Sequence, residues 1–313
     1  MPRRSPFRSL SWPAILLFLV FAGCRQWQKQ AQTPPQPPKR SAPRAPSRVP
    51  SRVPSRADDK APAPPSGSLL RSSNEGNLLF GNPSNAGQDE ANFLLDRAPY
   101  SLSYNRDKGG PNWVAWHTDA SNLGLIERSN DFAPDLDLPA AWQVRPSDYR
   151  GSGYDRGHVC PSGDRTANRQ DNSATFYMSN MLPQTGALNR HVWADLENYV
   201  RDQIRGGYEA YQIAGGAGSA GTIAGGKVTI PQVCWKIVVL LPLGNGDLNR
   251  VNTLTRVIAV GMPNVDDKRL ETGDWRSYRT TVAKIEGATG LKLFSNLPAS
   301  VRSALRGQID ANP

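Results

Sequence analysis

Histidine and cysteine, the residues that most often bind zinc, are scarce in this sequence of 313 residues. The chain contains three histidines, His117, His158 and His191, and three cysteines, and no two cysteines have the spacing Cys-x-x-Cys. A structural zinc ion usually needs about four such ligands close together. The sequence therefore argues against a zinc-binding domain, and each histidine needs another explanation.

The sequence also lacks a nucleotide-binding phosphate loop. Residues 215–226 hold six glycines, but these do not form the pattern Gly-x-x-x-x-Gly-Lys-Ser/Thr. In that pattern, backbone amides surround the phosphates of a nucleotide. Its absence argues against a hydrolase of the P-loop class, and we expect a mobile loop between two strands in this segment.

The whole chain carries a net charge of +10 at pH 7, but most of the chain has no net charge. Residues 1–65 hold twelve Lys or Arg and two Asp, while residues 66–313 hold 25 basic and 25 acidic residues. The excess therefore lies entirely in the first 65 residues. A partner of the remaining part must be bound by a local patch, because no long-range field of one sign exists there.

The first 24 residues are typical of an export signal. Three arginines precede an apolar run at residues 12–20, which is too short to span a membrane comfortably as a mature helix. The ending Phe21-Ala22-Gly23-Cys24 resembles a bacterial lipoprotein signal, although Phe21 stands where Leu is usual. The resemblance implies lipidation of Cys24 and anchoring to a bacterial membrane, at the outer membrane or cell surface. Ordinary secretion with an incidental cysteine is the alternative.

Residues 25–70 form a linker rich in proline, serine and arginine, with a short Pro-Ser-Arg-Val repeat. Proline at this density blocks helix formation and sheet pairing, and too few apolar residues remain to build a core. We interpret the segment as a spacer. It leads to one domain at residues 71–313, which is long enough to bury a hydrophobic core.

This domain has many candidate strands and few candidate helices. Runs of β-branched and aromatic residues predict strands at residues 112–118, 210–214, 233–241 and 253–260. Helical spacing predicts a helix over residues 278–286 that ends at Gly287. His117 falls on a strand face, and we interpret it as structural and not as a ligand. The pattern predicts an α+β fold with a mainly antiparallel central sheet flanked by helices.

Two motifs carry the chemistry: Tyr154-Asp155-Arg156-Gly157-His158, and a second that runs from Asn189 to Arg201. A histidine between a strand edge and a loop can act as a base near neutral pH. An asparagine at a helix start offers its carbonyl oxygen to a hard cation. In such a helix, Glu197 and Arg201 follow at steps of about four residues, where they would by themselves suggest only an exposed salt bridge.

Together the motifs resemble the signature of the DNA/RNA non-specific endonucleases of the ββα-metal class. That signature is Asp-Arg-Gly-His, followed by Asn-Arg-x-x-Trp-x-x-Leu-Glu, and both halves occur here in the same order. Further similarity at Ser103-Tyr104-Asn105-Arg106 and Trp235-Lys236-Ile237-Val238 extends the resemblance over about residues 77–300. The chain is most similar to the cyanobacterial-type secreted nucleases of this family.

The resemblance implies a role for each residue of the site. His158 is the expected general base, and Asp155 is expected to orient the loop that carries Arg156 and His158. Asn189 is the expected direct ligand of Mg²⁺, for which Mn²⁺ could substitute. Glu197 is expected to reach the metal through water. Phosphate contacts are expected from Arg128 and Arg201, assisted by Arg156.

The implied substrates are DNA and RNA, single- or double-stranded and without sequence preference, because phosphate contacts do not read bases. A protein inhibitor is a further candidate partner. Two other readings remain open: a surface lipoprotein for adhesion or DNA uptake with an inactive nuclease fold, and a delivered antibacterial toxin. His158 and Asn189 would be expected to be missing from the former, and both are present.

Cys160 and Cys234 both lie within the domain. Because the chain is expected to be exported, these two cysteines are candidates for a disulfide bond. If they do not pair, we expect them to be buried apolar residues.

Overall fold

The computed structural model describes residues 76–312, which fall within the predicted domain 71–313. The export signal, Cys24 and the linker lie outside the described residues. The strands are β1 (Gln88–Asp89), β2 (Asn92–Asp96), β3 (Ser101–Asn105), β4 (Gly110–Thr118), β5 (Asp155–His158), β6 (Met181–Gln184), β7 (Tyr208–Ala217), β8 (Thr222–Ile223), β9 (Val228–Thr229), β10 (Val233–Pro242) and β11 (Arg256–Pro263). The α-helices are α2 (Arg169–Ala174), α3 (Trp193–Arg205), α4 (Asp247–Arg250), α5 (Lys268–Thr272), α6 (Val282–Thr289) and α7 (Ala299–Gly307).

Seven strands form the central sheet, in the order β1-β2-β3-β4-β7-β10-β11. Every neighbouring pair in it is antiparallel. The predicted antiparallel sheet is therefore confirmed, and the strands expected in four runs of sequence correspond to β4, β7, β10 and β11. No helix in the described part of the chain is both long and apolar enough to cross a membrane.

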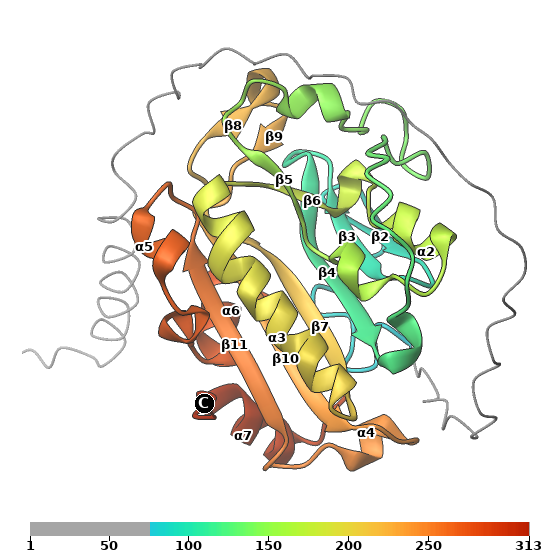
Figure 1. The fold of residues 1–313 in the computed structure, drawn as a ribbon, viewed down its shortest axis with the longest axis vertical. Coiled ribbons are helices and arrows are strands. Elements are labelled where there is room, and N and C mark those ends of the chain that lie inside the picture. Colours follow the sequence, from blue (N-terminus) through green and yellow to red (C-terminus); the bar gives the residue numbers. More distant parts are fainter. Residues whose placement is uncertain (1–75, 313) are drawn as a thin grey trace, which may run out of the picture.

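Side chains alternate between the two faces of a sheet, and helices cover each face of this one (Figure 1). On one face, Val238 and Leu240 of β10 pack in a core that includes Leu196 and Val200 of α3. On the other, Trp235, Ile237 and Val239 lie in a second core with Val282 and Ile285 of α6 and Leu305 of α7. Because both faces are buried, β10 is almost uniformly apolar.

A second, smaller sheet pairs β5 with β6 in antiparallel register, and α3 follows β6 along the chain. This ββα unit lies on the side of the central sheet where α3 crosses β7 and β10 (Figure 1). The Asp-Arg-Gly-His motif is the whole of β5, with the burial of its residues increasing toward His158. The fold therefore brings the two sequence motifs into one supersecondary unit.

Two expectations about local structure were wrong, the bounds of one helix and the form of the glycine-rich segment. The helix expected at residues 278–286 begins at Val282, where the Thr281 side chain caps it, and it continues through Gly287 to Thr289, with Gly290 as its C-cap at a φ of 75°. The glycine-rich segment is not a single loop, since β7 continues to Ala217 and β8 lies within it. Gly215 is a strand residue at a close approach: a Cβ there would lie 2.5 Å from the carbonyl oxygen of Asn112.

The expected disulfide is absent, because Cys160 and Cys234 are free cysteines in the structure. Both are buried in the core beneath α3, Cys160 just after β5 and Cys234 in β10. Burial raises the pKa of each thiol to about 12. They are the unreactive apolar residues of the alternative interpretation.

Candidate active site

Strand β5 presents His158 and Arg156 on one side, and a tight contact on its other side fixes the strand. Gly157 pairs with Leu182 of β6, and a Cβ at Gly157 would lie 1.9 Å from Oε1 of Gln184. Any other residue would require the Gln184 side chain to move. The glycine of the motif therefore allows Gln184 to pack directly against β5.

His158 is enclosed by two aromatic rings. Its ring centroid lies 4.7 Å from that of Phe176 and 5.5 Å from that of Phe132. Burial, together with the positive charges of Arg128 and Arg156, lowers the pKa of His158 to about 3. The imidazole is therefore neutral at neutral pH.

The two ring nitrogens of His158 differ in their access to water. Nε2 is buried and has no hydrogen-bond partner. Nδ1 makes no hydrogen bond within the described residues either, yet it is not among the buried unpartnered atoms. Nδ1 is therefore the ring nitrogen that faces the side that water can reach.

Two arginines flank this histidine without a carboxylate hydrogen-bonded to either of them in the described residues. The guanidinium of Arg156 lies 4.0 Å from the ring centroid of Phe132. The guanidinium of Arg128 lies 4.9 Å from that of Phe176, and Arg128 donates hydrogen bonds to the side chains of Ser162 and Asn130. Stacking on aromatic rings holds both cations in place while their charge remains available to an anion.

Asn189 lies in a π-helical turn, residues Leu188–Val192, immediately before α3. The backbone leaves helical geometry at His191, so Asn189 is not on the regular α3 ladder that the four-residue spacing suggested. Its Nδ2 donates a hydrogen bond of 3.0 Å to Asp155. Because a carboxylate only accepts hydrogen bonds, this contact fixes the amide with Oδ1 turned away from Asp155 and free of partners in the described residues.

The role found for Asp155 differs from the expected one. It was expected to orient the loop with Arg156 and His158, but its hydrogen bonds go to Asn189 and to Arg190. Hydrogen bonds from Arg190 and Asn189 hold the pKa of Asp155 below its usual value, although partial burial opposes them. The carboxylate therefore remains ionised and links β5 to the turn that carries Asn189.

Glu197 and Arg201 of α3 do not form the salt bridge that their spacing suggested. Arg201 donates to Asp164 over 2.9 Å and to Asn198 over 2.7 Å. Glu197 instead accepts a hydrogen bond of 3.2 Å from Lys236 of β10. Burial alone would lower the pKa of Arg201, but attraction to Asp164 and Glu197 raises it overall.

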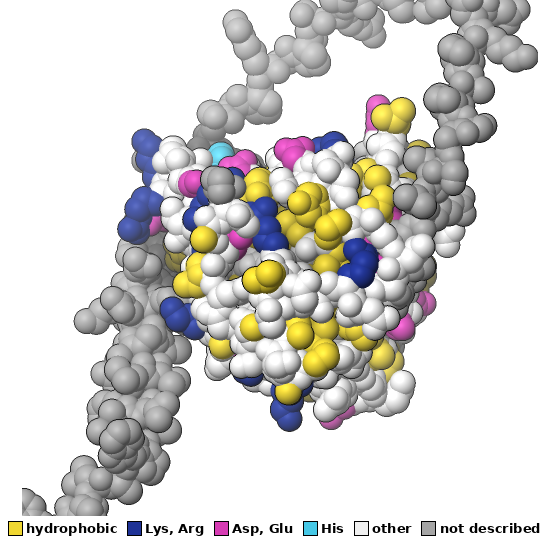
Figure 2. All heavy atoms as spheres, turned by 90° about the horizontal axis from the view of Figure 1, so that it is seen from below, with side chains coloured by type: hydrophobic (Ala, Val, Ile, Leu, Met, Phe, Trp, Pro, Cys, Tyr) yellow, Lys and Arg dark blue, Asp and Glu magenta, His cyan; other side chains and the backbone are white. Residues whose placement is uncertain are grey.

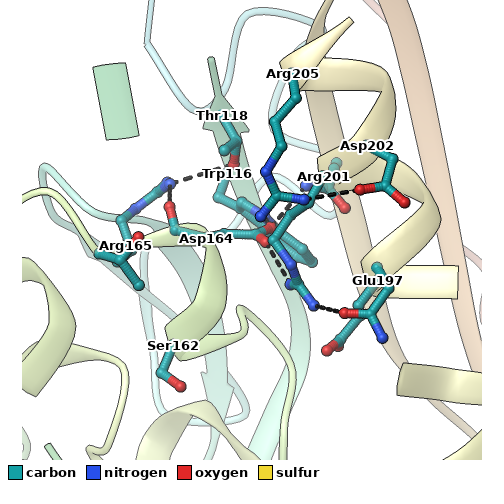
Figure 3. A network of polar contacts seen from close by, with 12 residues as sticks. Trp116, Thr118, Ser162, Asp164, Arg165, Glu197, Arg201, Asp202 and Arg205 are labelled. Atoms are coloured by element: carbon teal, nitrogen blue, oxygen red, sulfur yellow. Dashed lines mark hydrogen bonds and ion pairs between the residues drawn. The ribbon is translucent and has the colours of Figure 1, made fainter. Parts of the chain in front are cut away.

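Asp164 is the centre of the network around Arg201 (Figure 3). One of its oxygens accepts from Arg201, and the other accepts 2.9 Å hydrogen bonds from Trp116 and Gln212. These donors come from α3, β4 and β7, so one buried carboxylate ties the helix to the central sheet. Sequence reasoning missed Asp164, since nothing near it distinguishes it from an ordinary turn aspartate.

Lys236 and Phe132 were also missed as parts of the site. A signal for Lys236 existed, because it is the one charged residue within the apolar strand β10. Phe132 carries no such signal, since it lies in a loop and meets His158 only through the tertiary fold.

A separate group of residues has the composition of a metal site. Ligand atoms of His117, Glu209 and Asp247 all lie within 4.8 Å of one another, and all three residues are buried. His117 does lie on β4, as expected, but it contacts Glu209 over 2.9 Å. Arg250 donates to both carboxylates of this group, over 2.7 Å to Asp247. A guanidinium thus already supplies the positive charge that a metal ion would bring.

Comparison with known proteins places these observations in a family. The model of the DNA/RNA non-specific endonuclease family matches residues 80–300. A nuclease of Nostoc sp. is 46% identical over 237 residues, which cover 74% of this chain and 85% of the relative. This chain belongs to the DNA/RNA non-specific endonuclease family. Nuclease C1 of Cunninghamella echinulata is 32% identical over 241 residues, covering 71% of this chain and 89% of the relative.

The fold agrees with that of a solved member of the ββα-metal nucleases. EndoG, in its complex with EndoGI, has a TM-score of 0.60 to this structure and 26% sequence identity, covering 71% of this chain and 91% of that chain. The predicted fold class is therefore confirmed. Family membership makes this chain a nuclease, and the family is metal-dependent.

Proposed function

We propose that this nuclease hydrolyses internal phosphodiester bonds of single- and double-stranded DNA and of RNA, with His158 as the general base and Mg²⁺ as the cofactor. The observation that carries the proposal is the neutral, buried imidazole of His158 between two arginines that lack carboxylate partners in the described residues. A base next to uncompensated positive charge suits an anionic substrate whose attacking water must lose a proton.

Nδ1 of His158 is the atom that takes this proton. In the free protein, the low pKa makes His158 a weak base, and the adjacent arginines contribute to that weakness. A bound phosphate compensates the charge of Arg128 and Arg156, which removes one cause of the lowered pKa. Substrate binding therefore strengthens the base at the moment when it is needed.

Arg128 and Arg156 are the residues that hold the phosphate oxygens in this proposal. Arg201 contributes less directly, because its terminal nitrogens already donate to Asp164 and Asn198. Contacts of this kind carry no base information. Cleavage is therefore expected to depend little on sequence or on the sugar.

The residues present fit a hard divalent cation. Oδ1 of Asn189 is free of protein partners among the described residues, and so is one oxygen of Glu197. Both are oxygen donors of the type that Mg²⁺ and Mn²⁺ prefer. Asn189 would hold the ion directly and Glu197 through water, and the bound ion would stabilise negative charge on the leaving oxygen. Asp155 acts by keeping the amide of Asn189 in the required orientation.

The inactive-fold alternative predicts no activity, and the toxin alternative predicts activity with a different biological target. The proposal is tested by digesting plasmid DNA, single-stranded DNA and RNA with Mg²⁺ or Mn²⁺, and with EDTA. His158→Ala and Asn189→Ala should each lower kcat by several orders of magnitude, since loss of a general base alone commonly costs about 10²- to 10⁴-fold. Wild-type turnover in folded His158→Ala protein would contradict the mechanism.

We further propose export and lipid anchoring through Cys24, based on the sequence of residues 1–24. Labelled palmitate should enter the wild-type protein and not Cys24→Ser.

The similar EndoG structure is a complex described as showing the mechanism of EndoG inhibition. We extend this to the present chain as a proposed partner, a protein inhibitor.

A further inference from the structure

Lys236 has an unusual position for a lysine. It lies in the middle of β10, with Ala214 of β7 on one side and Val260 of β11 on the other, and its exposed fraction is 0%. Lysine is rarely buried completely unless it is paired, because removing an ammonium group from water is costly. A buried lysine in the strand beneath α3 therefore needs a partner that offsets this cost.

The partners of Lys236 all belong to the neighbourhood of the candidate active site. Its Nζ donates to Oε1 of Glu197 over 3.2 Å. The same nitrogen lies 4.5 Å from the ring centroid of Trp193 and 5.3 Å from that of Trp116. Trp193 is the first residue of α3, four residues before Glu197. Two aromatic faces and one carboxylate thus define where the ammonium group lies.

The two carboxylate oxygens of Glu197 differ in their hydrogen bonding. Oε1 is held by Lys236, whereas Oε2 has no hydrogen-bond partner among the described residues and is not among the buried unpartnered atoms. Oε2 is therefore open to solvent on a side chain that is only 13% exposed. A carboxylate that is held at one oxygen has little rotational freedom. Its other oxygen can therefore accept a hydrogen bond from a fixed direction.

Two arginines near Glu197 could compete for this carboxylate. The positive charge of Arg201 and that of Arg128 both act on Glu197. Arg201 is held by Asp164 instead, and Arg128 donates to neutral side chains. The Glu197 carboxylate is therefore held by Lys236. The arginines that an incoming phosphate requires are not hydrogen-bonded to it.

We propose that Lys236 is a positioning residue for the metal site, which anchors Oε1 of Glu197 so that Oε2 is presented to the hydrated cation. This inference rests on the proposed function, in which Glu197 holds the cation through water. Lys236 itself touches neither substrate nor cation. Its loss should weaken metal binding and turnover while leaving the affinity for nucleic acid unchanged, because the phosphate-binding arginines are not altered. Groups that orient metal ligands typically contribute about 10- to 100-fold in metal affinity or activity.

The test compares Lys236→Met with the wild-type protein. Methionine keeps an unbranched side chain between the two tryptophan rings and removes the charge and the donor. Titration with Mn²⁺, followed by its electron paramagnetic resonance signal without substrate, should give a dissociation constant raised at least about 10-fold. The kcat for plasmid cleavage should fall by a similar factor, with KM for DNA unchanged. In a Glu197→Gln background, Lys236→Met should cause no further loss of Mn²⁺ affinity.

Val238→Ala provides the matched control. Val238 lies two residues along the same strand, on the same face, and is fully buried in the hydrophobic core. Its truncation should lower the melting temperature while Mn²⁺ affinity and kcat stay at wild-type values. A purely structural role for Lys236 would make Lys236→Met behave like Val238→Ala, and that result would overturn the proposal.

Two further outcomes, an inactive wild-type protein and an unfolded variant, can be distinguished from failure of this proposal. If the wild-type protein cleaves no nucleic acid with either metal, the proposed function fails, yet the Mn²⁺ titration still decides whether Lys236 supports a cation site. If Lys236→Met does not fold, Lys236→Leu, which also lacks the charge and the donor, takes its place. Wild-type Mn²⁺ affinity in folded Lys236→Leu protein would count against the proposal.

Discussion

Single residues in this nuclease acquire their chemistry from what surrounds them. The sequence predicts that His158 is a base, but it does not show that Phe132 and Phe176 enclose the ring. Those contacts bury the ring, and burial together with the charges of two nearby arginines keeps the imidazole neutral. Asn189 behaves similarly, since Asp155 decides which end of its amide is free.

The lowered pKa of His158 predicts how the free energy of unfolding depends on pH. In the unfolded chain the imidazole has its ordinary pKa of about 6.5. Between pH 6.5 and about 3, the unfolded chain therefore binds a proton that the folded protein does not, so stability falls as the pH is lowered through this window. The contribution between pH 6.5 and 4.5 is about 2 kcal/mol. Urea unfolding of the wild type and of His158→Gln at both pH values measures it.

His158→Gln is the comparison because glutamine has no titrating group at this position. Carboxylates elsewhere change stability with pH equally in both proteins, so only the difference between their pH dependences reports on His158. The wild type should lose more stability than the variant on acidification. An identical loss in both would mean that the folded imidazole takes up its proton in the same pH range as the unfolded one, so that its surroundings do not lower its pKa.

Among the helices and strands, the sequence predicted the strands that have a continuous apolar or aromatic pattern. It misplaced the helix boundary that depends on a capping side chain. β4 and β10 were expected from their apolar and aromatic runs, because such patterns reflect burial of both faces. The start of α6 was misplaced by four residues, since its start is fixed by the Thr281 cap. The π-helical turn at Asn189 has no local signal, because it depends on contacts such as that between Asp155 and Asn189.

Asp164 allows a test of how the elements are held together. It accepts hydrogen bonds from α3, β4 and β7, and its side chain is buried. Asp164→Ala would leave the mostly buried Arg201 without its carboxylate partner, and removal of one member of such a pair typically costs about 3–5 kcal/mol. We expect a loss of that order in the free energy of unfolding, measured with urea.

Asp202→Ala is the matched control for this measurement. Asp202 also pairs with an arginine of α3, Arg205, over 2.7 Å, but both side chains of that pair are exposed. Its removal should change the free energy of unfolding by less than about 0.5 kcal/mol. Equal effects of the two substitutions would show that Asp164 does not connect the helix to the sheet.

For the whole molecule, the distribution of charge matters more than its total. Residues 66–313 carry as many acidic as basic side chains. On the face shown in Figure 2, Lys and Arg side chains are scattered among acidic and apolar ones and form no continuous basic surface. Local arginines such as Arg128 can hold one phosphate, but a long nucleic acid gains little attraction from this domain as a whole.

The arginine-rich residues 25–65 are therefore proposed to gather substrate without taking part in the chemistry. Each arginine that meets a phosphate of duplex DNA releases a counterion and adds roughly 0.9 to the slope of log affinity against log salt. A chain of residues 66–313 should bind DNA more weakly at low salt than residues 25–313, and with a shallower slope. Fluorescence anisotropy with labelled duplex DNA at several salt concentrations measures both.

Turnover separates this role from a catalytic one. Binding that is equal in the ground state and the transition state changes KM and leaves kcat unaltered. The two chains should therefore share one kcat at saturating DNA, and their KM values should converge as salt screens the arginines. If these arginines instead lie against anionic lipid or cell-wall polymers, the slopes for DNA will be equal, and the charge of residues 25–65 will have to be explained by the surface to which the protein is anchored.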